Sequence, residues 1–291
     1  MNIKTSLSHR SKEPENGVLY IVGTPIGNLN DISFRGLEIL NNVDIIACED
    51  TRQTKKLISK FNVNNNLISF NQHNSRNKIP RLIQYLESGK SMALVSDAGL
   101  PGISDPGEDL VKALRVKGLE VICVPGPNAA LTALVTSGFP SSRFIFEGFL
   151  PKKKIDREKV LHQISQNSKT TIIFESPHRI IKLLEELEFF CGEKREIHIA
   201  RELTKKYEEH IVTTVGASKN HISNKKILGE FTIVIKGLDN PTFDNFDHYS
   251  LKKDLMNLID AGLSLSSAAK YLSKKENLPK NIIYNLHKKP K

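Results

Sequence analysis

Three segments rich in glycine and proline are the ones best suited to hold a small ligand. They are residues 22–29 (VGTPIGNL), 96–107 (SDAGLPGISDPG) and 124–130 (VPGPNAA), and each follows a short apolar run typical of a strand. Glycines let backbone amides approach a ligand closely. Loops at the carboxyl ends of parallel strands line the ligand crevice of an α/β sheet. The three segments therefore predict one ligand site at the carboxyl edge of a sheet.

The residue spacing argues against several other kinds of site. Gly23 and Gly27 do not form a G-x-G-x-x-G pattern, so a dinucleotide site is poorly supported. The cysteines Cys48, Cys123 and Cys191 lie far apart without a C-x-x-C pair, and the nine histidines show no H-E-x-x-H spacing. We expect no metal site and no disulfide, and we expect the cysteines to be small buried hydrophobic residues.

The charge balance favours a polyanionic partner. Lysine and arginine outnumber aspartate and glutamate by 42 to 32, a formal charge of +10, which suits binding to phosphates. No apolar run reaches the roughly 20 residues that span a bilayer, and residues 1–16 lack the apolar centre of a signal peptide. We expect a cytoplasmic protein, with residues 1–16 as a disordered tail and no membrane association.

The elements that must position the three segments are those of an α/β fold. Between residues 17 and 126, apolar runs alternate with helical patterns, which predicts an N-terminal α/β domain with a parallel sheet covered on both faces. The expected strands are 18–22, 43–47, 67–70, 92–95 and 121–124, and the expected helices include 35–41, 80–87 and 106–116. Asp105 is expected to cap the last of these helices, with Pro106 at its first position and Glu108 completing a capping box.

Residues 127–237 predict a second, mixed α/β domain. Its expected strands are 144–146, 171–174, 197–200, 211–214 and 231–235, with one strongly amphipathic helix over 177–190 that starts at Ser176 and Pro177. Residues 238–249 resemble a linker. Residues 250–291 predict three short helices broken at Gly262 and Pro279. They form either a helix-turn-helix-like unit or a small helical bundle docked on the body.

Six motifs in this order and spacing resemble the tetrapyrrole-methylase-like, or class III, methyltransferases, in particular those that modify ribosomal RNA. They are VGTPIGNLND (22–31), IIACEDTR (45–52), SDAGLPGISDPG (96–107), VPGPNAA (124–130), FESPHR (174–179) and ARELTK (200–205). The resemblance implies two α/β domains with S-adenosylmethionine between them, a small C-terminal helical unit and a homodimer. It also implies a target in 16S rRNA, the ribose 2′-hydroxyl of a cytidine in the decoding centre of the small ribosomal subunit.

The resemblance also implies which residues touch the methyl donor. They come from the three loops of the first domain and from two segments of the second: Pro25, Asp97, Ala98, Gly99, Ile103, Asn128, Ala129, Phe174, Glu175, Leu203 and Thr204.

A ribose hydroxyl is weakly acidic, so its methylation benefits from a general base. The candidates are Glu49, Asp50, Asp97, Glu202 and Lys205. The lysine would have to be neutral, which requires burial or a nearby cation. In the alternative reading, Asp97 braces its loop and residues 49–52 merely start a helix.

Arg52, Lys152, Lys153 and Lys154 are candidates for gripping rRNA phosphates, although they could equally be ordinary solvated charges. Two other functions compete with rRNA methylation. One is methylation of a tetrapyrrole, which the shared superfamily favours and the basic charge disfavours. The other is a non-catalytic RNA-binding or ribosome-assembly factor, against which a retained donor site would argue.

Overall fold

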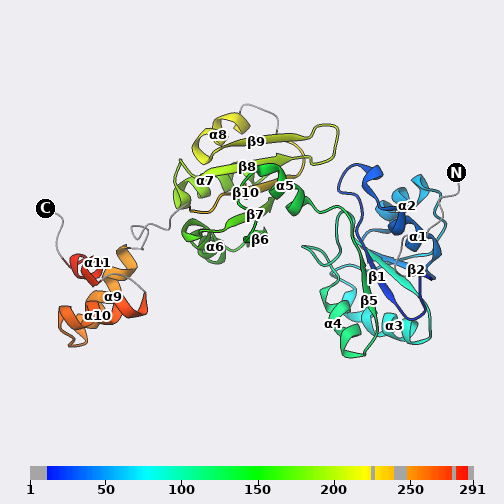
Figure 1. The fold of residues 1–291 in the computed structure, drawn as a ribbon, viewed down its shortest axis with the longest axis horizontal. Coiled ribbons are helices and arrows are strands. Elements are labelled where there is room, and N and C mark those ends of the chain that lie inside the picture. The colour runs from blue at the N-terminus through cyan, green and yellow to red at the C-terminus, as the bar shows by residue number, and fades with distance from the viewer. Residues whose placement is uncertain (1–11, 224–226, 239–247, 277–279, 288–291) are drawn as a thin grey trace.

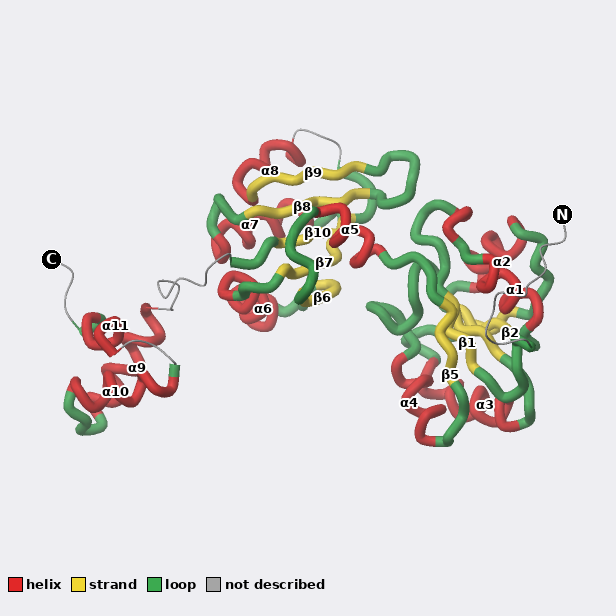
Figure 2. Tube along the Cα trace, in the orientation of Figure 1, coloured by secondary structure: helices red, strands yellow, loops and turns green. Residues whose placement is uncertain are grey.

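The computed structural model describes residues 12–223, 227–238, 248–276 and 280–287. Two five-stranded sheets, each with its own helices, are followed by a group of three helices at the C-terminal end (Figures 1 and 2). The predicted linker lies almost entirely outside the described residues, as do residues 1–11 and Pro279. Residues 12–16 are described, and there Glu13 accepts two hydrogen bonds of 2.7 Å from Arg35.

The first sheet is parallel and has the strand order β3-β2-β4-β1-β5. Its strands are β1 (Leu19–Val22), β2 (Ile45–Cys48), β3 (Leu67–Ser69), β4 (Met92–Val95) and β5 (Val121–Val124). Its helices are α1 (Phe34–Asn42), α2 (Thr51–Lys60), α3 (Ser75–Glu87) and α4 (Glu108–Val116), with the short 3₁₀ helix η1 (Leu29–Asp31) before α1. Apolar residues of α1 and α2 pack on one face of the sheet and those of α3 and α4 on the other, so both faces are covered as predicted.

The strand order explains why the three glycine-rich loops converge. β1 lies between β4 and β5, and all three strands are parallel, so the loops that follow them leave the same edge of the sheet. Thr24 and Gly99 join the first two loops through two backbone hydrogen bonds of 2.9 and 3.1 Å. A Cβ on Gly23 would lie 2.7 Å from Cα of Gly126. Only glycines therefore allow the first and third loops to pack this closely.

The second sheet is mixed and has the order β6-β7-β10-β8-β9. Its strands are β6 (Phe144–Phe149), β7 (Thr170–Glu175), β8 (Glu196–Arg201), β9 (Glu209–Thr214) and β10 (Phe231–Ile235), of which only β6 and β7 pair in parallel. Its helices are α5 (Ala129–Ser137), α6 (Lys154–Gln166), α7 (Ile180–Cys191) and α8 (Val215–Ser223). α6, α7 and α8 cover one face, whereas α5 covers the other and also contacts Ile26 of the first loop.

Two predicted helix starts are wrong. α4 begins at Glu108 with Gly107 as its N-cap, at φ 153°, and no side chain caps it. Asp105 is therefore free of the capping role that the sequence assigned to it. α7 begins at Ile180 instead of Pro177, because Ser176–Arg179 form a turn in which the Ser176 carbonyl accepts the N–H groups of Arg179 and Ile180.

The predicted amphipathic helix of the second half is α7, and the structure adds α5, α6 and α8, whose apolar periodicity is weak or whose sequence is short. The prediction for the cysteines is only partly right. Cys48 is buried as predicted, but Cys191 is only partly buried and Cys123 is exposed. Cys123 is exposed because β5 is an edge strand of its sheet.

The three C-terminal helices form a unit with its own core. They are α9 (His248–Asp260), α10 (Leu265–Lys275) and α11 (Lys280–Asn285), and Gly262 separates the first two at φ 97°, as predicted. Their shared apolar core contains Leu251, Leu255, Ala268, Ala269, Leu272 and Ile283. None of these residues belongs to the cores of the two sheets, so this unit buries its own hydrophobic surface.

Candidate functional site

A cavity of about 370 Å³ opens where the glycine-rich loops of the first sheet face the second sheet. Its lining is mostly apolar, with a few polar side chains. The lining residues are Ile26, Ala98, Gly99, Leu100, Ile103, Ser104, Asp105, Asn128, Ala129, Phe149, Phe174, Glu175, Ser176, Pro177, Leu203, Glu230, Phe231 and Thr232. We call this space the donor cavity.

Most residues predicted to touch the donor line this cavity. Ala98, Gly99 and Ile103 come from the second loop, Asn128 and Ala129 from the third, and Phe174, Glu175 and Leu203 from the second sheet. Pro25, Asp97 and Thr204 do not line it. Pro25 is a buried residue of the first loop and Asp97 is exposed, while Thr204 accepts a 2.9 Å hydrogen bond from the backbone N–H of Asn28.

Sequence reasoning missed several lining residues because only strand pairing brings them to the cavity. Phe231 and Thr232 lie on β10, opposite Glu175 and Phe174 of β7. Phe149 ends β6 and contacts Phe174 edge to face at 5.7 Å. Ile26 and Leu100 lie inside recognised motifs, so their membership of those loops was the available signal.

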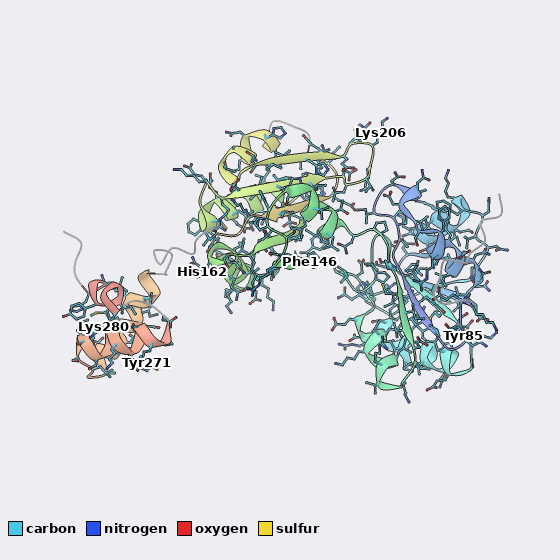
Figure 3. The ribbon with its side chains drawn as sticks, in the orientation of Figure 1. Tyr85, Phe146, His162, Lys206, Tyr271 and Lys280 are labelled. Carbon is cyan, nitrogen blue, oxygen red and sulfur yellow. The ribbon has the colours of Figure 1, made fainter. Side chains whose placement is uncertain are left out.

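The loop between β8 and β9 closes one side of the donor cavity. It extends toward the first sheet, and Lys206 near its tip lies at the edge that faces the N-terminal half (Figure 3). A Cβ on Gly27 would lie 2.6 Å from Oγ1 of Thr204 and 2.5 Å from Cγ of Lys205. Two non-glycine residues of this loop, Glu202 and Thr204, have positive φ angles of 52° and 65°. The loop therefore holds an uncommon conformation while it packs on the first loop.

A buried ion-pair network holds the carboxylate in the wall of the donor cavity. The Glu175 side chain is fully buried and pairs with Arg179 at 2.7 Å and with Arg157 at 3.4 Å. Arg157 also donates to Glu186 at 2.7 Å, and Glu175 accepts the N–H of Ser176 at 2.8 Å. Because two guanidinium groups already neutralise it, Glu175 is a structural brace and not a free base.

A second cavity of about 440 Å³ adjoins the donor cavity through Ser104 and Asp105, which line both. It lies at the carboxyl ends of β2, β3 and β4. Its other lining residues are Glu49, Phe70, Gln72, Ser75, Gly102, Pro106, Gly107, Glu108 and Asp109. We call this space the acceptor-side cavity, since it lies on the other side of the shared wall from the donor cavity.

The candidate bases differ in the pKa that their surroundings impose. The side-chain and backbone hydrogen bonds with Arg52 lower the pKa of Asp50 to about 2, and Asp50 caps α2 as the structural reading expected. Burial would lower the pKa of Lys205, but its ion pairs with Glu230 and Glu202, at 2.7 and 2.9 Å, raise it overall. Lys205 is therefore charged. Burial would raise the pKa of Glu202, yet its hydrogen bonds with Lys205 and with the Glu230 backbone lower it overall.

The remaining carboxylates have raised pKa values. Burial raises the pKa of Glu49, and the charge of Asp97 adds to this rise. Burial also raises the pKa of Asp97, which accepts the Asp50 N–H at 3.0 Å and so braces its loop. Burial raises the pKa of Asp105 to about 6, with Glu49 adding to the rise. Asp105, which the sequence assigned to a helix cap, thus has a pKa well above that of an ordinary aspartate.

The basic residues predicted to contact RNA are all exposed. Lys152 and Lys153 precede α6, and Lys154 is its first residue. They follow Phe149, which lines the donor cavity, by three to five residues in the chain. The Arg52 side chain is 86% exposed and pairs with Asp50 at 2.7 Å. No cluster of metal-ligating side chains occurs among the described residues, and no described helix is both long and apolar enough to cross a membrane.

Solved structures with the same fold bind and modify several kinds of molecule. A cobalt precorrin-4 methyltransferase matches with a TM-score of 0.57 and 18% identity, covering 76% of this chain and 95% of its own. A diphthine synthase matches with a TM-score of 0.57 and 14% identity, covering 75% and 90%. A Thermus thermophilus uroporphyrin-III C-methyltransferase complexed with S-adenosylhomocysteine matches with a TM-score of 0.52 and 13% identity, covering 74% and 96%.

Sequence relatives are much closer. Ribosomal RNA small subunit methyltransferase I of Bacillus subtilis is 41% identical over 275 residues, covering 93% of this chain and 94% of its own. The Synechocystis protein of the same name is 40% identical, covering 93% and 97%. The Thermotoga maritima protein of that name is 46% identical, covering 76% of this chain and 99% of its own. The profile of the tetrapyrrole (corrin/porphyrin) methylases matches residues 18–218. The chain therefore belongs to the ribosomal RNA small subunit methyltransferase I family, within the S-adenosylmethionine-dependent tetrapyrrole methylases.

Proposed function

We propose that the protein transfers a methyl group from S-adenosylmethionine to the ribose 2′-hydroxyl of a cytidine in the decoding centre of 16S rRNA. The observation that carries this proposal is the donor cavity, which gathers residues from five of the six motifs that resemble the rRNA-modifying methyltransferases. The names of the sequence relatives support small-subunit rRNA as the substrate class. The cytidine and its 2′-hydroxyl follow from the motif resemblance and stay predictions.

The lining of the donor cavity fits the methyl donor. Its volume is within the range of roughly 300–1,000 Å³ that is common for small-ligand sites. Ile26, Phe174 and Leu203 offer apolar walls to an adenine ring, and the glycine at position 99 lets backbone polar groups approach the ligand. When bound, S-adenosylmethionine supplies an electrophilic methyl group on a sulfonium. The protein's main contribution is then to align the acceptor oxygen with that methyl.

The phosphate backbone of the RNA would be held outside the cavities. Lys152, Lys153 and Lys154 are exposed shortly after Phe149 in the chain, where they can neutralise phosphates. The acceptor-side cavity has an acidic lining that includes Glu49, Asp105 and Glu108. Such a lining disfavours a tetrapyrrole that carries several carboxylates, whereas a nucleoside, whose phosphates stay outside, can enter. The presence of a donor cavity also argues against a purely non-catalytic assembly factor.

The homodimer is part of the same proposal. Leu131 and Val135 on α5 leave apolar side chains 49% and 73% exposed, which a second copy could cover. An enzyme that acts on ribosomal subunits would work in the cytoplasm. Both statements stay predictions, and sedimentation analysis of the purified protein checks the first.

The test combines donor binding with methyl transfer. Calorimetry should show that S-adenosylmethionine binds in the presence of a metal chelator, and labelled donor should methylate small ribosomal subunits but not a tetrapyrrole precursor. Methylation should fall steeply with added salt while donor affinity changes little, because only the phosphate contacts release counterions. Donor binding that needs a divalent ion, or transfer to the tetrapyrrole alone, would refute the proposal.

A further inference from the structure

We propose that Asp105 is the general base that takes the proton from the acceptor hydroxyl, and that the acceptor-side cavity receives the target nucleoside. This inference rests on the proposed function, since it concerns the acceptor half of the same site. It follows from where Asp105 lies between the two cavities, a position that the sequence pattern around it, which favours a helix cap, does not reveal.

Asp105 is placed where the two substrates must meet. Among the carboxylates that line the two cavities, it alone lines both. Glu175 and Glu230 line only the donor cavity, and Glu49, Glu108 and Asp109 line only the acceptor-side cavity. A hydroxyl that attacks the methyl group has to reach the boundary between the donor and its own nucleoside. Asp105 is the carboxylate at that boundary.

The loop that carries Asp105 is held in an uncommon conformation. Gly102, Ser104 and Gly107 have φ angles of 82°, 62° and 153°. A Cβ on Gly148 of β6 would lie 2.8 Å from the Ser104 hydroxyl oxygen, so the loop also packs on the second sheet. A left-handed serine is locally unfavourable, and such conformations persist where the surrounding structure over-determines them, often at functional sites. Here the effect is to turn Asp105 into the cavities and not onto the end of α4.

The surroundings of Asp105 suit a base. Burial and, to a lesser extent, the charges of Glu49 and Asp97 raise its pKa, a hydrogen bond with Ser96 lowers it, and together they bring it to about 6. The other charged groups in the walls around it are Glu175, Glu230, Glu108 and Asp109, all of which are acidic. A base with a pKa near the working pH combines ionisation with proton affinity. Glu49 does not reach the donor cavity, and Asp97 lines neither cavity.

The proposed step combines a methyl transfer with a proton transfer. The hydroxyl oxygen forms its new bond to the methyl carbon as the carbon–sulfur bond breaks and its electron pair stays on sulfur. The hydroxyl proton passes to a carboxylate oxygen of Asp105 and later leaves to water. The acceptor-side cavity would meanwhile hold the nucleoside, with Glu49 and Gln72 able to accept hydrogen bonds from an exocyclic amino group, a pairing typical of cytosine recognition.

The experiment compares the unaltered protein with Asp105→Asn, using Asp44→Asn as the matched control. Asp44 carries the same side chain at the opposite edge of the first sheet, just before β2, and lines neither cavity, and asparagine can still accept the Ser91 N–H that Asp44 accepts at 2.8 Å. We expect Asp105→Asn to lower the single-turnover rate on small ribosomal subunits roughly 10²–10⁴-fold. The donor Kd by calorimetry should stay within about threefold, because asparagine keeps the size and shape of the aspartate in the cavity wall. The control should keep most of its activity.

Two pH measurements separate a base from a structural residue. The single-turnover rate of the unaltered protein should fall as pH drops below about 6, because a protonated base cannot accept the proton. Carbon NMR on aspartate-labelled protein should show one carboxyl that titrates near this pH and is lost in Asp105→Asn. This readout needs no turnover.

The outcomes are distinct. If Asp105→Asn keeps its rate, or loses donor binding together with activity, the assignment is wrong and the proposed function stands. A carboxyl of Asp105 that titrates at the ordinary aspartate value also overturns it. If the unaltered protein binds the donor but methylates no ribosomal subunit, the proposed function fails and this role fails with it.

Discussion

At the scale of single residues, two acidic side chains at the carboxyl edge of the first sheet have pKa values shifted in opposite directions. Asp50 has its pKa lowered to about 2 by Arg52, so its charge stabilises the fold. Asp105 has its pKa raised to about 6 by burial and by neighbouring carboxylates, so its charged form destabilises the folded state. Destabilisation of this kind is common where activity needs a reactive group in an unfavourable place.

This contrast predicts opposite effects on stability. The folded pKa of Asp105 lies above its ordinary value, so the folded state holds the proton more tightly and stability falls as pH rises from about 4 to about 6. Asp105→Asn should therefore raise the melting temperature at pH 7–8, by a few degrees for a gain on the order of 1 kcal/mol. The gain should vanish below pH 4, where aspartate is protonated in both states.

For stability, Asp50→Asn is the matched comparison, with the sign of the expected effect reversed. The pKa of Asp50 is lowered in the folded state. Its contribution to stability is therefore fully present when the pH is above the ordinary aspartate pKa, and it is lost as the pH falls toward about 2. Its replacement should not stabilise the protein at neutral pH. Calorimetric melting curves from pH 3 to 8 check both variants, and a stabilised Asp50→Asn or a destabilised Asp105→Asn at pH 8 would contradict the argument.

At the scale of elements, the donor cavity depends on a contact between two loops that are far apart in the sequence. Residues 26–28 follow β1, and residues 203–205 join β8 to β9. The neighbours of Gly27 leave no room for a side chain, because a Cβ added there would lie 2.6 Å from Thr204 Oγ1 and 2.5 Å from Lys205 Cγ. Leu203 is buried against this contact and lines the cavity. The position of the β8–β9 loop thus sets the shape of the donor site.

Gly27→Ala should displace the β8–β9 loop and weaken donor binding. Overpacking of this kind costs about 1–3 kcal/mol. Because the two loops can move apart at this exposed contact, we expect the change to displace the cavity wall and raise the donor Kd roughly tenfold or more in calorimetry. The melting temperature should change little, because residue 27 is exposed and lies outside both cores.

The pair Thr204→Val and Thr204→Ser provides the matched control. Valine keeps the shape of threonine but removes the oxygen that accepts the Asn28 N–H, whereas serine retains that oxygen. We expect valine to weaken donor binding and serine to leave it nearly unchanged. Unaltered donor affinity in Gly27→Ala would show that this contact does not shape the cavity.

At the scale of the whole molecule, we predict that the C-terminal helices help to capture RNA, whereas donor binding belongs to the rest of the chain. Every residue that lines the donor cavity precedes residue 233. The C-terminal helices have a separate core and many exposed lysines, and Tyr271 and Lys280 lie on this unit (Figure 3). The T. maritima relative matches over 99% of its own length with only 76% of this chain, so about a quarter of this chain has no counterpart there.

Truncation after Gly237 should leave donor binding and the melting temperature of the body nearly intact while methylation of ribosomal subunits falls. The physical reason is that the C-terminal unit contributes no residue to the cores of the sheets, whereas its lysines can contact phosphates. Donor affinity, melting temperature and subunit methylation are to be measured on the same preparation.

A full-length variant with Lys252, Lys253, Lys270 and Lys274 changed to glutamine is the control. These lysines are exposed, so the helices should still fold, and methylation should fall with a weaker dependence on salt. If truncation abolishes donor binding and folding together, the unit is structural. If it leaves methylation unchanged, the unit does not recognise the substrate.

The sequence by itself determined the fold class and most of the donor loops, because these depend on local patterns. Alternating apolar runs predicted both sheets, and glycines after strands predicted the loops that line the donor cavity. Residues such as Phe231 and Thr232 could not be found this way, since the pairing of β10 with β7 joins segments more than fifty residues apart.

Only the tertiary structure decided where Asp105 lies and what surrounds it. Read locally, Asp-Pro-Gly-Glu is a helix start, and the sequence favoured a cap. In the folded chain the helix begins at Glu108, and Asp105 lies in the wall between two cavities. Burial and nearby charge, which determine the pKa of a carboxylate, come from residues as distant in the chain as Glu49. A sequence gives the type of a titratable residue, but the fold determines its electrostatic surroundings.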